Sequence, residues 1–112
     1  MMDATLDWKQ GLEKAGGDAR DYAQSLRAFM QLADASPAVV FAALERGDLQ
    51  TARESVHGVR VQAEELGCLE LAARSRDLEL AIRAGADTQM LYGRYACAVP
   101  DTLCAIAGYL AG

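Results

Sequence analysis

The sequence lacks the features of a membrane protein and of a β-sheet protein. No apolar stretch among its 112 residues approaches the ~20 residues that a membrane-spanning helix needs. Aromatic residues make up only 6 %, and Val, Ile and Thr together number 12, although strands are enriched in these types. Ala (22 residues) and Leu (14) instead dominate the apolar fraction of 52 %, and both lose little conformational freedom in a helix. The composition therefore predicts one all-α domain over residues 1–112.

Basic residues and secretion signals are also scarce. Lys and Arg number 11 against 16 Asp and Glu, which gives a net charge of −5 and argues against a nucleic-acid partner. The opening residues, Met1 to Ala4, show neither the basic nor the apolar region of a signal peptide. We therefore expect a cytoplasmic protein that associates with neither nucleic acid nor membrane.

The chain is poor in metal-binding residues. Its three cysteines, Cys68, Cys97 and Cys104, form no CxxC pair, and there is one histidine, which leaves too few ligands for a zinc site. Cys97 and Cys104 are seven residues apart, about 10.5 Å along one helix, which is beyond the reach of a disulfide. An odd number of cysteines without a signal peptide indicates reduced thiols. We expect no metal site and three thiols in the core.

Glycine and aspartate divide the chain into helices. Four glycine motifs are typical of a helix stop, most of them followed by an N-cap: Gly16-Gly17-Asp18, Gly47-Asp48, Gly67 and Gly85-Ala86-Asp87. They delimit one short and four long segments: Asp7–Lys14, Asp18–Arg46, Asp48–Leu66, Leu69–Ala84 and Asp87–Leu110. Four long helices with short connections predict an up-and-down antiparallel four-helix bundle, in which the short N-terminal helix covers one end.

Two prolines fall inside the long segments. Pro37 allows either one kinked helix or two helices, with Ser36 as the N-cap of the second. The apolar residues keep their helical phase across Pro37, which favours one nearly continuous helix. Pro100 is expected to kink or break the last segment.

The apolar residues of the third segment form one stripe. They recur at steps of three and four residues, which is typical of a seam that packs against other helices: Leu49, Ala52, Val56, Val59, Ala63 and Leu66. The fourth segment carries two apolar rows, which predicts neighbours on two sides: Leu71, Leu78 and Ile82, and Leu69, Ala73 and Leu80. The last segment has one row in phase: Tyr92, Ala96, Val99, Leu103, Ile106 and Leu110.

His57 is the only histidine, and the seam places it on the solvent face of the third helix. At 100° per residue its side chain points well over 100° away from the centre of the seam. A convex helical face offers no pocket for acid–base catalysis. A phosphoryl group suits this position, because neutral imidazole is a nucleophile at neutral pH and Arg60 offers a guanidinium three residues on. The exposed face of the helix also holds Gln50, Arg53, Glu54, Val61 and Glu64.

The residues that follow His57 resemble the histidine-containing phosphotransfer (HPt) domain of bacterial two-component phosphorelays. The family signature, His-x-Leu-Lys-Gly with Leu-Gly six residues later, corresponds here to His57-Gly58-Val59-Arg60-Val61 and Leu66-Gly67. The likeness extends over roughly residues 6 to 85. It implies a phosphoryl acceptor at His57, reacting through Nε2, and a phosphoryl-stabilising cation at Arg60.

The resemblance also implies the partners. A receiver domain of a response regulator, or a hybrid sensor histidine kinase, would exchange the phosphoryl group between its aspartate and His57. Mg²⁺ would belong to the receiver, so this chain would bind no cofactor, act as a monomer and have no kinase activity of its own. Arg53, Glu54, Val61 and Glu64 would contact the partner, and Glu54 or Glu64 is a candidate to orient the imidazole.

Two departures from the signature leave alternatives open. Arg60 replaces the usual Lys and keeps the charge, whereas Val61 replaces Gly and sets a branched side chain beside His57. If Val61 is a tolerated replacement, the chain is a working phosphoryl carrier. Impaired access predicts a degenerate adaptor that binds a receiver or another signalling protein without being phosphorylated. A third class is a helical dimerisation module whose seams over 49–66 and 92–110 are partly intermolecular.

Overall fold

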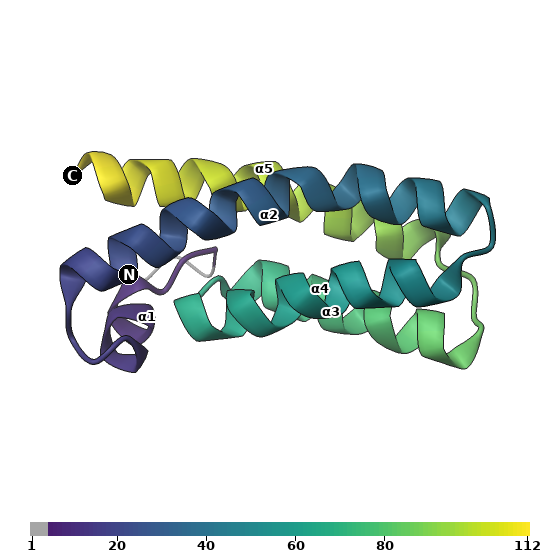
Figure 1. Ribbon diagram of the computed structural model, residues 1–112, viewed down its shortest axis with the longest axis horizontal. Helices are drawn as coiled ribbons and strands as arrows, with labels where there is room; N and C mark the ends of the chain where they lie inside the picture. Colours follow the sequence, from purple (N-terminus) through teal and green to yellow (C-terminus); the bar gives the residue numbers. More distant parts are fainter. Residues whose placement is uncertain (1–4) are drawn as a thin grey trace.

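The computed structural model describes residues 5–112, which form five helices and no strand (Figure 1). In chain order they are α1 (Trp8–Lys14), α2 (Ala19–Glu45), α3 (Leu49–Leu66), α4 (Leu69–Ala84) and α5 (Gln89–Ala111). The all-helical class is therefore confirmed, and the segments predicted from glycine and aspartate match the observed helices closely. No helix in this part of the chain combines the length and apolar character needed to cross a membrane.

Side-chain caps explain where the helices begin. Asp7 accepts a hydrogen bond from the backbone N–H of the residue three positions on, and Asp48 does the same. Asp18 accepts two such bonds at the start of α2. Each carboxylate satisfies amide groups that have no partner within the helix. Gly67 and Gly85 end α3 and α4 in the left-handed conformation, with φ of 83° and 67°, as glycine readily does.

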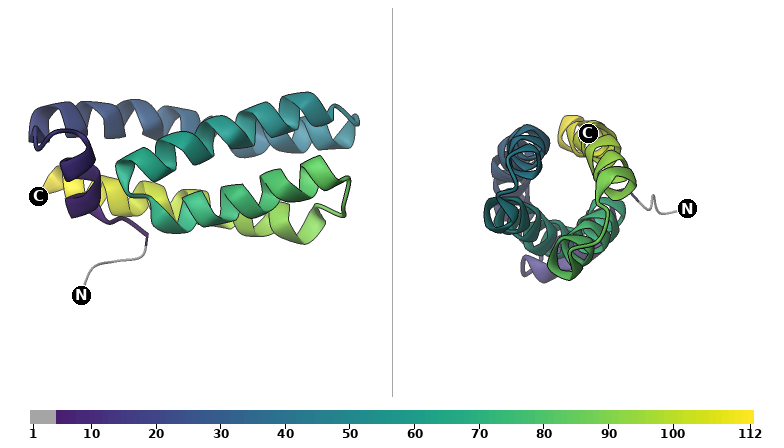
Figure 2. Two further views of the ribbon diagram at one scale, coloured as in Figure 1. Left: turned by 90° about the horizontal axis from the view of Figure 1, so that it is seen from below. Right: turned by 90° about the vertical axis from the view of Figure 1, so that its right-hand side faces the viewer.

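The four long helices pack around one core. α2 contacts α3 and α5, and α4 contacts the same two helices. Figure 2 shows them arranged about a common axis, with α1 near one end, where it contacts α3 and α2. The largest fully buried side chains are Tyr22, Tyr95, Phe29, Leu26, Leu71, Leu78 and Ile106. The result is an all-helical, bundle-like molecule measuring 41 × 25 × 21 Å.

The short helix α1 is fixed at its end by backbone contacts. The N–H of Asp7 donates to the carbonyl of Gly67 over 2.8 Å. The buried hydroxyl of Tyr22 donates to the carbonyl of Leu66 over 2.7 Å. Trp8 packs on Tyr109 with 5.7 Å between ring centroids. The first and third contacts hold α1 against the end of α3 and against Tyr109 of α5, and the second joins α2 to the end of α3.

The seam of α3 is confirmed except at its first residue. Ala52, Val56, Val59 and Ala63 are fully buried, whereas Leu49 is 47 % exposed. Leu49 opens the helix and lies at the edge of a hollow instead of in the core. On α4, the row of Leu71, Leu78 and Ile82 is buried.

The prediction of a second covered side on α4 is wrong. The row made of Leu69, Ala73 and Leu80 faces outward, and Leu80 is 54 % exposed. The reason is the packing order, because α3 and α5 are the main neighbours of α4 and both lie on its buried side. On α5, Val99 and Ile106 are buried and the rest of the predicted row is partly buried.

Neither proline interrupts its helix. α2 runs unbroken through Pro37 and α5 through Pro100, so the two-helix alternative at Pro37 and the break at Pro100 are not observed. Around Pro37 the chain is held by cross-helix bonds: the Tyr92 hydroxyl donates to its carbonyl over 2.8 Å. The Ser36 hydroxyl lies 2.7 Å from the Tyr95 hydroxyl in the core. Such tertiary contacts offset the one helical bond that a proline removes.

The expectation of three core thiols holds for one cysteine only. Cys68 is buried, and burial raises the pKa of its thiol to about 12. Cys97 and Cys104 are exposed. They lie two residues before Val99 and Ile106, a rotation of about 200° around α5, and so point away from the core that those residues fill.

Candidate functional site

His57 lies in the middle of α3 with its side chain 48 % exposed, as the sequence predicts. Its Nδ1 atom is 3.0 Å from Oε2 of Glu79, which α4 carries. Because α3 and α4 pack directly against each other, a residue 22 positions away in the chain becomes the partner of the ring.

Glu79 is a buried carboxylate with three polar neighbours, namely the imidazole of His57 and the guanidinium groups of Arg60 and Arg83. The residue is 3 % exposed. Besides His57, it accepts a hydrogen bond from Nε of Arg60 over 2.8 Å, and Nη2 of Arg83 lies 3.4 Å away. Burial by itself raises the pKa of Glu79, but the hydrogen bonds from Arg60 and His57 outweigh it and hold that pKa below its ordinary value. The carboxylate is therefore charged at neutral pH.

Arg60 is held in place by several acceptors. In addition to the bond from Nε to Glu79, its Nη1 donates to Oε1 of Glu64 over 3.0 Å. Its Nη2 lies 3.1 Å from Nδ1 of His57. The hydrogen bonds to Glu79 and Glu64 raise the pKa of Arg60. The guanidinium thus lies on the Nδ1 side of the imidazole and clamps Glu79 there.

The neighbours of Nδ1 select one tautomer of His57. Glu79 offers only acceptor oxygens, so Nδ1 must carry the proton to bond with it. Nη2 of Arg60 is a second donor 3.1 Å from Nδ1. A lone pair on Nδ1 would, however, repel the charged oxygen of Glu79 at 3.0 Å, so the carboxylate favours the proton on Nδ1. With the proton on Nδ1, Nε2 keeps its lone pair. No residue between 5 and 112 forms a hydrogen bond with Nε2, so this nitrogen is a free nucleophile on an exposed ring.

The other residues expected at the site have separate positions. Arg53 and Glu54 line a hollow together with His57 and Arg83. Glu54 accepts a hydrogen bond from the Gln50 side chain over 3.0 Å, and Glu64 pairs with Arg60. Neither Glu54 nor Glu64 forms a hydrogen bond or ion pair with the imidazole, so the carboxylate that orients it is Glu79 instead.

Val61, the residue in place of the signature's glycine, is 44 % exposed on α3. It follows His57 by one helical turn and so lies on the same side of the helix. Gly58, the residue after His57, has open space around the position that a Cβ atom would occupy. The face around His57 therefore carries an apolar side chain on one flank and charged ones on the other.

The sequence patterns above did not identify Glu79 or Arg83 as site residues, although one pattern in α4 points to Glu79. Four residues of α4 recur at steps of three and four and are buried: Ala72, Ser75, Glu79 and Ile82. A carboxylate inside such a row needs a cationic or donor partner from another element. The row therefore marks Glu79 as paired, but it does not identify His57 as the partner.

Neither metal ligands nor similar proteins assign a function to this site. Within the described residues, no three His, Cys, Asp or Glu side chains gather in a way that would hold a metal ion. No family model, curated protein or solved structure matches the chain. The function must therefore be argued from the side chains themselves.

Proposed function

We propose that this protein is a phosphorelay intermediate that carries a phosphoryl group on Nε2 of His57. The observation that carries the proposal is the pair formed by Nδ1 of His57 and the buried carboxylate of Glu79, 3.0 Å apart, which leaves Nε2 free on an exposed ring. An imidazole in this state can attack phosphorus and can also surrender the group again. The proposed partner is the phosphorylated aspartate of a receiver domain or of a hybrid sensor histidine kinase.

The proposed transfer balances in charge and atoms. The lone pair of Nε2 attacks the phosphorus of an aspartyl phosphate, the N–P bond forms, and the carboxylate of the partner leaves with the electron pair of its O–P bond. The ring keeps its Nδ1 proton and becomes a cation. Glu79, charged and 3.0 Å away, neutralises this cation as it develops, in a site where solvent screening is weak.

The fold agrees with this proposal. Each connection between successive long helices is short, so neighbours along the chain run in opposite directions. We propose an up-and-down four-helix bundle covered at one end by α1, forming one HPt-like domain. The proposed carrier is a cytoplasmic monomer. It needs no kinase activity of its own, because the phosphoryl group and Mg²⁺ are supplied by the receiver.

The partner surface is proposed to surround His57 on α3. Val61 gives it an apolar contact with 44 % of the side chain exposed. Arg53, Glu54 and Glu64 add charged groups that select the partner, since charge complementarity favours one docking orientation and disfavours others.

The second candidate is an adaptor that binds a receiver without accepting phosphate. It is favoured by Val61, because a branched side chain one turn from His57 narrows the approach to the ring. The two functions differ in one measurable step, the formation of phosphohistidine.

The deciding experiment is labelling by a phosphorylated receiver domain. A carrier acquires acid-labile, base-stable phosphate, and the variant His57→Gln acquires none. Phosphate that persists in His57→Gln would remove this residue from the acceptor role. Receiver binding without any labelling, unchanged in His57→Ala, would select the adaptor.

A further inference from the structure

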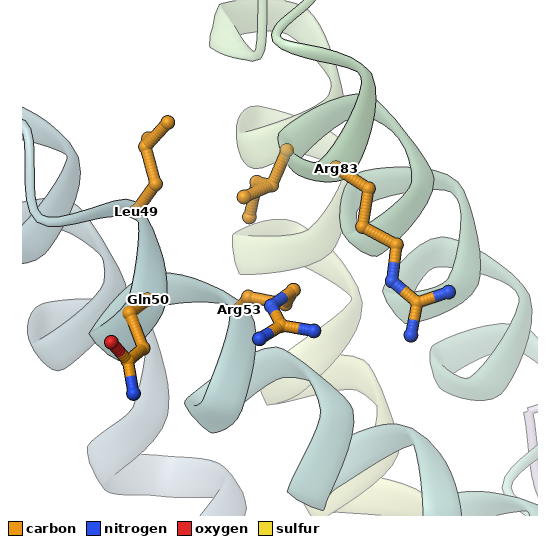
Figure 3. Close-up of a pocket in the computed structure, with 5 residues that line it drawn as sticks. Leu49, Gln50, Arg53 and Arg83 are labelled. Atoms are coloured by element: carbon orange, nitrogen blue, oxygen red, sulfur yellow. The ribbon is translucent and has the colours of Figure 1, made fainter.

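Two arginines from different helices share a hollow with His57. Arg53 of α3 and Arg83 of α4 line it with Glu54 and the histidine itself. Its volume is about 150 Å³. The same two arginines line a neighbouring hollow with Leu49, Gln50 and Ile82. Figure 3 shows both guanidinium groups projecting into the space between the two helices.

The charge of this hollow is not balanced by its own residues. Arg53 forms no hydrogen bond or ion pair with any residue from 5 to 112. Arg83 has one, the 3.4 Å contact with Glu79, and its side chain is 54 % exposed. Behind them, the carboxylates of Glu79 and Glu64 share one cation, Arg60. Among the residues that line the hollow itself, two guanidinium groups face the single carboxylate of Glu54, so both keep N–H donors for an anion.

Arg60 is poorly placed to supply this charge. Its guanidinium bonds Glu79 and Glu64 and lies on the Nδ1 side of His57. Releasing it would leave the buried carboxylate of Glu79 without its closest cation, and an unpaired buried charge is costly. Arg53 has no ion pair to give up, and Arg83 gives up only its 3.4 Å contact with Glu79, which keeps the shorter bond from Arg60.

We propose that Arg53 and Arg83, and not Arg60, bind the phosphoryl oxygens when His57 is phosphorylated. This inference rests on the proposed carrier function and names the cations that act in it. Each guanidinium donates charge-assisted hydrogen bonds to the phosphoryl dianion. Arg83 exchanges its long contact with Glu79 for a phosphoryl oxygen, while Glu79 keeps Arg60 and His57. No proton moves between these groups.

Phosphoramidate tests the assignment without any protein partner. Nε2 of His57 attacks its phosphorus, the N–P bond of the protein forms, the N–P bond of the donor breaks, and ammonia leaves. The rate of phosphohistidine formation is measured for the wild type, Arg53→Gln, Arg83→Gln and Arg60→Gln. Arg27→Gln, which removes an exposed charge from α2, is the matched control, and Arg83→Lys keeps the charge without the fork. Thermal unfolding reports the fold of every variant.

We expect Arg53→Gln and Arg83→Gln each to slow labelling about tenfold, the effect of losing one hydrogen bond to a charged group. Arg83→Lys is expected to recover part of the labelling rate that Arg83→Gln loses, and Arg27→Gln is expected to label at the wild-type rate. Arg60→Gln lowers the melting temperature, and its labelling slows less than in the other two arginine variants.

Labelling of Arg53→Gln and Arg83→Gln at the wild-type rate overturns the inference, while loss of label in His57→Gln still upholds the carrier. A dominant loss in Arg60→Gln with an intact fold returns the phosphoryl contact to Arg60 and also overturns it. If neither phosphoramidate nor a phosphorylated receiver labels the wild type, the carrier function fails and this inference fails with it.

Discussion

Nδ1 of His57 lies 3.0 Å from Oε2 of Glu79, although 22 positions separate the two residues in the chain. One belongs to the exposed face of α3 and the other to the buried side of α4. The pair combines a charged carboxylate, shielded from water, with a ring whose second nitrogen is free. It is the relationship from which the proposed chemistry follows.

Glu79→Gln is expected to destabilise the protein in a pH-dependent way. The substitution removes the charge that Arg60 pairs with, and we expect a loss of about 2 kcal/mol in the free energy of unfolding at pH 7. Because the folded-state pKa of Glu79 lies below its ordinary value of 4.5, the ionised group stabilises the fold above that pH. This contribution is lost as the pH falls through the lower folded pKa.

The measurement is urea unfolding of the wild type and Glu79→Gln between pH 3 and pH 8. The difference between them is expected to be constant above about pH 6 and to shrink below about pH 4.5. Glu65→Gln, an exposed change on α3, serves as the control and leaves stability unaltered. A Glu79→Gln deficit that stays the same down to pH 3 would contradict an ionised, paired Glu79.

Val61→Gly tests the departure from the signature. Removing the branched side chain opens the approach to His57, so the rate of phosphoryl transfer from a receiver is expected to stay equal or rise. The glycine costs about 1 kcal/mol of helix stability relative to alanine at the same position. Val61→Ala removes the branches without that cost and is expected to behave alike in transfer. A large loss of transfer in both variants would instead make Val61 part of the recognition surface.

Gly67→Ala is expected to destabilise the end of the bundle by about 2–3 kcal/mol. Gly67 has a φ of 83°, and a Cβ there would collide with the carbonyl oxygen of Asp7. Gly85 is a matched control, since its φ of 67° is also left-handed but its surroundings are open. Gly85→Ala is expected to cost only about 1 kcal/mol. Equal costs in thermal unfolding would show that the contact with α1 contributes nothing.

Thiol reagents are expected to modify Cys97 and Cys104 in the native protein and to leave Cys68 untouched. The first two are exposed, and Cys68 is buried with a pKa raised to about 12. The thiolate is the reacting form, so Cys68 stays inert even at pH 9 until the chain is unfolded. Mass spectrometry counts the labels. The double variant Cys97→Ser/Cys104→Ser takes up none when folded, and rapid labelling of it would contradict the buried position of Cys68.

The sequence by itself determined which segments are helices and which way His57 faces. Local rules suffice for both: Asp7, Asp18 and Asp48 cap amides within the next three residues, and Gly67 and Gly85 adopt a backbone conformation that costs glycine little. The exposure of His57 followed from the seam, because 100° per residue fixes the angle between them.

Only the tertiary structure decided which side chains meet. The register between α3 and α4 brings Glu79 to His57 and Arg83 to Arg53, and no periodicity within one helix specifies that register. The same holds for Leu80, left outside because the neighbours of α4 lie on its other side. A helix pattern depends on residues three and four positions apart, whereas the site depends on how two helices slide and rotate against each other, and that is set by the packing of the whole core.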